Sequence, residues 1–234
     1  MSLIQEMIDI DSPDGTFQAY LSRPEVDEPR AALIVVQEIF GVNEHIRAVC
    51  DRYAEAGYAC IAPELFWRVE PGFSLGYEPE DIARGREVMA RVPVDSAVDD
   101  VLWTQRALED RFGLGAGRTG VVGYCWGGLV AYLCAARLSP ACVSAYYGAG
   151  IANYLDEVED MDCPIMFHFG SEDAAISADQ VTRIREAIQG RPAEVFSYDG
   201  AGHGFNCEQR ASHHPEAAKM AWERTLRLLE DQLG

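Results

Sequence analysis

A cysteine between two glycines is the residue most clearly placed to do chemistry. Residues 123–128 read Gly-Tyr-Cys-Trp-Gly-Gly, which is the nucleophile-elbow pattern with Cys125 where serine is usual. In an elbow, a sharp turn between a strand and a helix strains the nucleophile's backbone, and the flanking glycines remove Cβ atoms that would clash. The helix N-terminus favours thiolate, the form of cysteine that attacks carbon. The alternative is a buried structural cysteine, because free cysteine is among the most buried residue types.

Two further side chains could complete a catalytic triad with Cys125. Asp173 and His203 follow it in the order nucleophile, acid, histidine, which is the chain order of α/β-hydrolases. His203 would then transfer protons, while Asp173 would fix the tautomer of the imidazole and stabilise its charged form. Asp173 could instead be a helix cap or a turn residue. His203 stands between Gly202 and Gly204, a poor place for packing, which favours a functional role.

A carboxylate at the end of a predicted buried strand is a fourth candidate. Glu38 follows the apolar run at residues 31–36, and burying a carboxylate is costly unless a neighbour uses its charge. One interpretation is that Glu38 contacts the thiol of Cys125 and controls its proton. The other is a residue at the rim of the site that pairs with an arginine.

The histidines and cysteines give little sign of a metal site. His203 and Cys207 are four residues apart and could form half of one, but no second pair is evident, so we expect no metal and no cofactor. The seven cysteines are scattered and include no Cys-x-x-Cys pair, which is typical of reduced thiols in a cytoplasmic protein. His168 falls inside a predicted strand, whereas we expect solvated helix or loop positions for His45, His213 and His214.

The strands that must position these side chains are short and apolar. Runs typical of buried parallel strands lie at residues 31–36, 58–62, 118–122, 141–147, 164–169 and 193–198. Residues 8–21 predict an N-terminal hairpin around an Asp-Ser-Pro-Asp-Gly turn, and residues 23–30 predict a loop.

Helical patterns alternate with these strands, at residues 43–56, 81–92, 96–112, 129–138, 177–188 and 215–233. Residues 65–79 have no regular period and predict a long loop over the carboxyl edge of the sheet, where substrates are usually contacted. The alternation predicts an α/β fold with a mostly parallel central sheet and helices on both faces. We expect a single domain over residues 1–234.

The composition excludes several classes of function. The 234 residues carry 19 basic and 38 acidic side chains, and the net charge of −19 argues against nucleic acid or an anionic membrane as a partner. No apolar run approaches the roughly 20 residues that span a bilayer. The first ten residues lack a basic segment followed by an apolar one, so we expect no signal peptide and a cytoplasmic protein.

Four separated motifs resemble those of the dienelactone hydrolase family. They read Gln-Glu-Ile-Phe-Gly at residues 37–41, Gly-Tyr-Cys-Trp-Gly-Gly at 123–128, Gly-Ser-Glu-Asp at 170–173 and Gly-His-Gly-Phe at 202–205. The resemblance covers nearly the whole chain and implies an α/β-hydrolase fold without a large cap domain. It also implies carboxymethylenebutenolidase-type activity, whose type reaction hydrolyses a dienelactone to maleylacetate in chlorinated-aromatic breakdown.

The same resemblance implies a role for each candidate residue. Cys125, Asp173 and His203 would form the triad, and Glu38 would hold the resting thiol and give way when substrate binds. The oxyanion hole would consist of two backbone N–H groups, those of Ile39 and Trp126.

The sequence departs from the family pattern at positions that would contact substrate. The best-known members place an arginine four residues after the histidine to hold a substrate carboxylate, but here that residue is Cys207, and Arg210 is the nearest candidate. A second family arginine corresponds to either Arg84 or Arg86. Trp126 replaces a smaller apolar residue, which should alter the wall of the pocket.

We therefore predict a hydrolase that cleaves a lactone or small carboxylic ester, with a carboxylate-bearing small molecule as substrate. One alternative is a broad small-ester or thioester hydrolase, and another is a non-catalytic thiol sensor or ligand-binding protein on the same fold. Asp173 and His203 argue against the last, since a binding module needs neither a base nor a group that orients it. We expect a monomer or a small homo-oligomer.

Overall fold

In the computed structural model, which describes residues 2–26 and 29–234, an eight-stranded sheet forms the centre of the molecule. Its strand order is β1-β2-β4-β3-β5-β6-β7-β8. The six neighbouring strands β4, β3, β5, β6, β7 and β8 are parallel to one another. The hairpin of β1 and β2 pairs with β4 through β2, in antiparallel orientation. Their bounds are β1 Leu3–Ser12, β2 Gly15–Pro24, β3 Ala32–Val36, β4 Ala59–Pro63, β5 Thr119–Tyr124, β6 Cys142–Tyr146, β7 Ile165–Gly170 and β8 Ala193–Tyr198.

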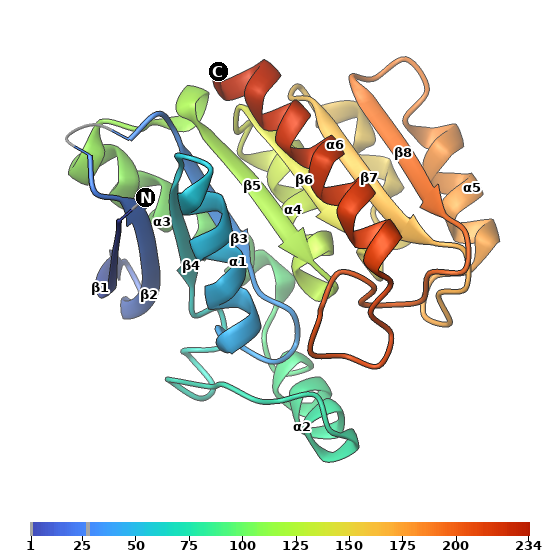
Figure 1. The fold of residues 1–234 in the computed structure, drawn as a ribbon, viewed down its shortest axis with the longest axis horizontal. Coiled ribbons are helices and arrows are strands. Elements are labelled where there is room, and N and C mark those ends of the chain that lie inside the picture. The colour runs from blue at the N-terminus through green and yellow to red at the C-terminus, as the bar shows by residue number, and fades with distance from the viewer. Residues whose placement is uncertain (1, 27–28) are drawn as a thin grey trace.

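Helices cover both faces of this sheet. Figure 1 shows α1 and α6 on one face and α3, α4 and α5 on the other, with α2 beyond the carboxyl ends of the strands. The helices span α1 Glu44–Glu55, α2 Pro79–Met89, α3 Val94–Phe112, α4 Trp126–Arg137, α5 Ala178–Ala187 and α6 Pro215–Leu233. Short 3₁₀ helices lie in the connections to the strands, at Ala116–Arg118, Ile151–Asn153 and Leu155–Asp160. The predicted α/β-hydrolase fold is confirmed.

The central strands are buried on both faces, as their solid apolar runs predict. Every residue of β3, β4 and β5 is buried, and so is every residue of α4 except the last. The burial of this apolar surface away from water is the main contribution to the free energy that holds the helices against the sheet. The carboxyl edge of the sheet is thereby fixed as a rigid base for the loops that follow each strand.

A polar network crosses the core where α6 packs on the sheet. His168 of β7 lies between two hydroxyl groups, with Nδ1 2.8 Å from Tyr198 Oη and Nε2 3.1 Å from Thr225 Oγ1. Thr225 Oγ1 also lies 2.8 Å from Tyr146 Oη and 3.0 Å from Ser144 Oγ. Buried polar groups are tolerated when they are paired in this way.

Several element boundaries differ from the sequence predictions. The hairpin extends beyond the predicted residues 8–21. The sequence underestimates its length because the outer strand, β1, is largely exposed and has no continuous apolar run. The helix predicted from residue 129 begins at Trp126, since tertiary packing overrides the low helix propensity of Gly127 and Gly128. The predicted loop at residues 23–30 is shortened by β2, and residues 27–28 lie outside the described residues.

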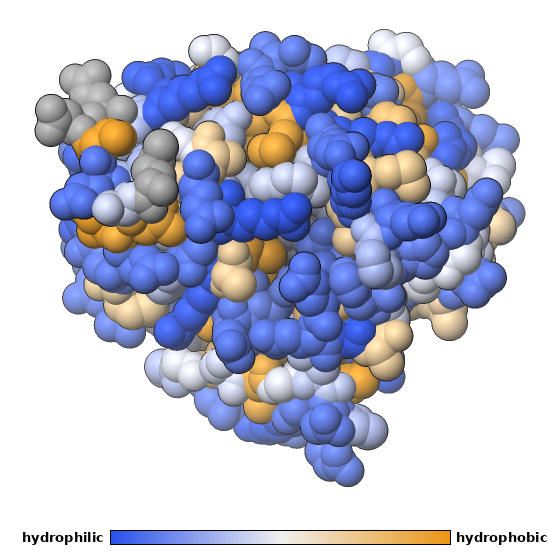
Figure 2. All heavy atoms as spheres, viewed as in Figure 1, coloured by the Kyte–Doolittle hydropathy of each residue, from blue (hydrophilic) through white to orange (hydrophobic). Residues whose placement is uncertain are grey.

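The carboxyl edge carries only small additions in the described part of the chain. The loop at residues 64–78 and α2 lie over it, and the described residues form no large cap domain. On the face drawn in Figure 2, hydrophilic side chains predominate and hydrophobic ones are scattered. Within residues 2–26 and 29–234, no helix has the length and apolar character needed to cross a membrane.

Candidate active site

The backbone at Cys125 has the strained geometry of a nucleophile elbow. Cys125 lies between β5 and α4 with φ 56° and ψ −119°, a region that non-glycine residues rarely adopt. A Cβ at Gly123 would lie 1.9 Å from the carbonyl oxygen of Gly127, and a Cβ at Gly127 would lie 2.4 Å from that of Val36. Only glycine fits either position. The turn therefore presents a half-buried thiol at the N-terminus of α4.

A continuous line of hydrogen bonds joins the three predicted triad residues. His203 Nε2 lies 3.0 Å from Cys125 Sγ, and His203 Nδ1 lies 2.8 Å from Asp173 Oδ2. The other carboxylate oxygen, Asp173 Oδ1, accepts the backbone N–H groups of Ala175 at 2.8 Å and Ile176 at 3.2 Å. Asp173 is thus both a turn residue and the partner of the imidazole.

The charges around His203 favour its protonated form. Burial by itself lowers the pKa of His203, but the negative charge of the Cys125 thiolate and the hydrogen bond with Asp173 outweigh burial and raise that pKa to about 10. The Tyr147 ring packs against the imidazole in an edge-to-face arrangement, with ring centroids 5.2 Å apart. At neutral pH His203 is therefore held in its protonated form between Asp173 and Cys125.

Glu38 is fully buried and engages an arginine and a tyrosine. Its Oε1 accepts from Arg210 Nη1 at 3.2 Å, and its Oε2 accepts from Tyr77 Oη at 2.9 Å. Asn43 Nδ2 donates to the same tyrosine oxygen at 3.2 Å. Within the described residues no hydrogen bond joins Glu38 to Cys125. Pairing with an arginine is one of the two interpretations of Glu38, although the carboxylate is buried rather than at a rim. Its control of the Cys125 proton stays a prediction.

Tyr77 and Asn43 were missed by sequence reasoning. Tyr77 belongs to the loop that lies over the carboxyl edge, and Asn43 is the N-cap of α1. A single aromatic residue in an irregular loop belongs to no sequence motif. Only the position of Tyr77 in the predicted substrate loop could have indicated a functional role.

Two backbone N–H groups beside the thiol lack an acceptor. Within the described residues, neither Ile39 nor Trp126 donates its backbone N–H to any hydrogen bond. Trp126 is the first residue of α4, where helix N–H groups have no intrahelical partner. Both residues line the same cavity as Cys125. These are the N–H groups that the family resemblance implies for an oxyanion hole.

A cavity of about 680 Å³ opens above the thiol. Arg86 and Arg210 line it, whereas Arg84 does not and pairs instead with Glu70 and Glu87 at the surface. Of the two arginines in this helix that were candidates, Arg86 therefore lines the cavity and Arg84 does not, and Trp126 forms part of the wall. Apolar side chains make up most of the remaining lining: Ile39, Phe40, Ile82, Met89, Val94, Leu129, Ala149, Tyr154, Ala174 and Ala175.

A second group of titratable side chains lies next to this site. His45, predicted to be solvated, is buried, and it lies close to Cys207 and Glu38. Burial lowers the pKa of His45 and raises the pKa of Cys207 to about 11, so both are neutral at pH 7. Cys207 thus lies beside His45, and the sequence could not indicate this because Cys207 and His45 belong to distant segments.

The other two histidines expected to be solvated lie near the start of α6. His213 and His214 are both partly exposed. His214 caps α6, since its Nδ1 accepts the backbone N–H of Ala217 at 3.2 Å.

Comparisons with protein families, with individual proteins and with solved structures all point to the same family. The family model described as the dienelactone hydrolase family matches residues 17–233. A protein of Synechocystis sp. named "Putative carboxymethylenebutenolidase" is 32% identical over 240 residues, covering 97% of this chain and 96% of that protein. The solved structure titled "Putative Dienelactone Hydrolase" from Klebsiella pneumoniae is 33% identical, covers 98% of this chain and 99% of that one, and gives a TM-score of 0.89. A dienelactone hydrolase-like promiscuous phosphotriesterase from metagenomic libraries, with 15% identity, full coverage of both chains and a TM-score of 0.85, shares the fold.

Proposed function

We propose, since the chain belongs to the dienelactone hydrolase family, that it hydrolyses a lactone or small carboxylic ester through Cys125, His203 and Asp173. The observation that carries this proposal is the hydrogen-bonded line from Asp173 through His203 to Cys125, at 2.8 Å and 3.0 Å, at a cavity that could hold a small molecule. Nucleophile, base and orienting carboxylate in contact are the geometric requirement for covalent acyl transfer.

The first half of the reaction forms a thioester. The thiolate of Cys125 attacks the carbonyl carbon, and the π electrons of the carbonyl move onto its oxygen. The N–H groups of Ile39 and Trp126 would stabilise that oxyanion, and in other acyl-transfer enzymes one such donor contributes roughly 3 kcal/mol. When the carbon–oxygen bond of the ester breaks, His203 donates its proton to the leaving oxygen. In a lactone this oxygen stays attached to the acyl group.

The second half releases the acid. Neutral His203 takes a proton from water, and the resulting hydroxide attacks the thioester carbon. Cys125 leaves as thiolate, which restores the thiolate–imidazolium pair. Asp173 stabilises the imidazolium in both halves, because its Oδ2 accepts the hydrogen bond of Nδ1.

The cavity supports a carboxylate-bearing substrate. Its walls are largely apolar, and two arginines, Arg86 and Arg210, line it. Arg210 already pairs with Glu38, whereas Arg86 makes no ion pair within residues 2–26 and 29–234. Arg86 is therefore the arginine we assign to an incoming carboxylate, while the apolar wall packs against the rest of a small acyl group.

Replacing the nucleophile tests the reaction class. Cys125→Ala should abolish hydrolysis of small activated esters and of a dienelactone, because no thiolate remains to attack, while the circular dichroism spectrum stays native. Cys163→Ala, which removes a thiol outside the cavity, is the matched control and should retain activity. Activity in Cys125→Ala would refute the assignment. A wild-type protein that turns over no ester or lactone would favour the thiol-sensor alternative.

A substrate panel tests the carboxylate preference. We expect Arg86→Ala to raise KM for lactones with a free carboxylate by roughly tenfold, since a charge-assisted hydrogen bond contributes about 1.5–3 kcal/mol. KM for matched neutral lactones should stay unchanged. Arg84→Ala is the control, because that side chain pairs with Glu70 and Glu87 away from the cavity. Equal rates for charged and neutral members would favour a broad small-ester or thioester hydrolase.

A further inference from the structure

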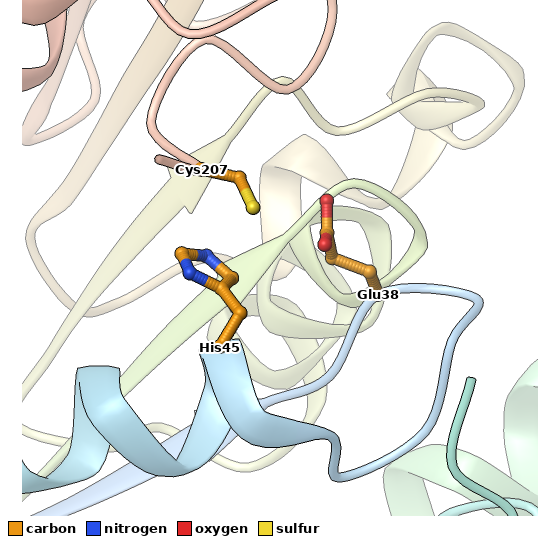
Figure 3. Close-up of side chains that lie close together, drawn as sticks. All are labelled: Glu38, His45 and Cys207. Atoms are coloured by element: carbon orange, nitrogen blue, oxygen red, sulfur yellow. The ribbon is translucent and has the colours of Figure 1, made fainter. Parts of the chain in front are cut away.

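Three side chains with metal-binding chemistry converge beside the candidate active site. Glu38, His45 and Cys207 each offer one ligating atom, and these atoms all lie within 4.8 Å of one another. Figure 3 shows the carboxylate, the imidazole ring and the thiol facing a common point from three separate segments. We propose that this Glu38–His45–Cys207 cluster binds a thiophilic divalent cation, with Zn²⁺ as the chemical type, at a site distinct from the thiol of Cys125.

The donor set selects the kind of cation. Thiolate sulfur, imidazole nitrogen and carboxylate oxygen are together the ligands of Zn²⁺, whereas Mg²⁺ and Ca²⁺ take oxygen ligands. Bonds of about 2.0–2.3 Å to a tetrahedral Zn²⁺ place neighbouring ligand atoms roughly 3.5 Å apart. Ligand atoms already within 4.8 Å need only small side-chain rotations to reach that geometry.

An independent observation at His45 points to a ligand. His45 Nε2 is buried and has no hydrogen-bond partner in the described part of the chain, and the residue is only 7% exposed. A buried polar atom without a partner is uncommon in native proteins and calls for an explanation. A ring nitrogen with a free lone pair is the form of histidine that binds metals.

The fold holds the three ligands from different elements. Glu38 follows β3, His45 lies in the first turn of α1, and Cys207 lies in the segment between β8 and α6. The rings of Tyr77 and His45 lie nearly perpendicular with centroids 6.3 Å apart, and the Tyr77 hydroxyl donates to Glu38. The Tyr77 hydroxyl or a water molecule could take the fourth position. Such a site needs the folded protein, since its ligands are far apart in the chain.

Binding has a defined balance of protons and charge. The S–H bond of Cys207 breaks, the proton leaves to solvent, and a sulfur–metal bond forms, with no oxidation or reduction. Glu38 exchanges the Tyr77 hydroxyl for the metal while Oε1 remains next to Arg210. None of these steps depends on the ester hydrolysis proposed above.

Cobalt titration of the Cys125→Ala protein tests the proposal without interference from the catalytic thiol. We expect a thiolate-to-cobalt charge-transfer absorption that saturates at one Co²⁺ per chain and is displaced by Zn²⁺. Adding Cys207→Ala should remove the absorption, and adding His45→Gln should weaken Co²⁺ binding at least tenfold. The matched control is the added change Cys163→Ala, which should leave the absorption in place.

Three results would overturn the proposal: no thiolate-to-cobalt absorption at stoichiometric Co²⁺, an absorption that survives Cys207→Ala, or one that Cys163→Ala removes. If Cys207→Ala does not fold by circular dichroism, the His45→Gln titration decides the question. A measurement without further variants is also decisive, because Zn²⁺ bound to the native state must raise the melting temperature of the Cys125→Ala protein.

Discussion

Asp173 shows how one side chain can satisfy both a structural and a chemical demand. Oδ1 accepts the N–H groups of Ala175 and Ile176 in the turn after β7, and this fixes the direction of Oδ2 toward His203. A carboxylate oriented by its own turn loses little conformational entropy when it holds the imidazole. The local sequence alone could not separate the two roles, because both are present.

Asp173→Asn tests the orienting role at the residue scale. The amide oxygen can still accept from the turn, but the amide nitrogen would donate to Nδ1 of His203 and leave Nε2 protonated. In that tautomer His203 cannot accept a proton, so kcat should fall by roughly 10²–10⁴-fold while the melting temperature changes little. The measurement is kcat on a small activated ester, alongside a thermal melt.

Asp179→Asn is the matched control for this change, since Asp179 is exposed in the first turn of α5. It should leave kcat within about twofold of wild type. An unchanged kcat in Asp173→Asn would show that the hydrogen bond to His203 has no part in proton transfer.

At the scale of elements, the site depends on how closely α4 approaches β3 and β5. The turn between β5 and α4 brings the backbone of Gly127 against Val36 and Gln37, where no side chain fits. The loops after β3, β5, β7 and β8 then supply Glu38, Cys125, Asp173 and His203 at one edge. Parallel strands require this convergence, since their carboxyl ends lie on the same side.

Gly123→Ala tests the close approach. The new Cβ would lie 1.9 Å from the Gly127 carbonyl oxygen and 2.8 Å from Ala131 Cβ, so the strand and helix must separate. We expect a loss of unfolding free energy of at least about 3 kcal/mol, or failure to fold. Urea unfolding measures the change.

Gly117→Ala is the control for Gly123→Ala. No atom lies within 4 Å of a Cβ at Gly117, so its unfolding free energy should stay within about 0.5 kcal/mol of wild type. Equal effects of the two changes would show that the elbow does not need glycine at position 123.

At the scale of the whole molecule, a net charge of −19 surrounds a cavity lined by arginines. The global field disfavours anions, and Arg86 and Arg210 oppose it locally. The pKa values of two histidines are shifted in opposite directions. His168 is buried as a neutral group, because burial and the charge of Arg224 lower its pKa to about 3, whereas the pKa of His203 is raised.

His168 should make the native state sensitive to acid. The unfolded chain binds a proton at this residue below its ordinary pKa of 6.5, and the folded protein does not until about pH 3. Its contribution to stability is therefore fully present above pH 6.5 and is lost as pH falls toward 3, at about 1.4 kcal/mol per pH unit.

Comparing unfolding free energies at pH 7 and pH 4.5 checks this expectation. His168→Gln should lower stability at pH 7, because it breaks the contacts with Tyr198 and Thr225, but it should reduce the further loss on acidification. His213→Gln, in the loop before α6, serves as control. Parallel curves for wild type and His168→Gln would contradict the expectation.

His203 should make the native state less stable at alkaline pH. Its folded pKa is about 10, so its stabilising contribution is present below pH 6.5 and is lost as pH rises through 10. Extending the same unfolding measurements to alkaline pH, with His203→Gln as reference, should show this loss for wild type alone.

Local patterns in the chain were enough to predict the order of strands and helices, the elbow at Cys125 and the candidates Asp173 and His203. Each of these depends on residues near one another in sequence: apolar runs, glycines around a nucleophile, and polar residues after strands. Family resemblance added Ile39 and Trp126, which do line the cavity with free N–H groups among the described residues.

Other features became visible only in three dimensions. The partners of Glu38, the burial of His45 beside Cys207 and the separation of Arg84 from the cavity all depend on contacts between distant segments. Periodicity reports which face of an element is buried, but it carries no distance between side chains on different elements. Those distances are set by the packing of α1, α2 and the loops on the carboxyl edge of the sheet, and this packing decides which polar groups meet.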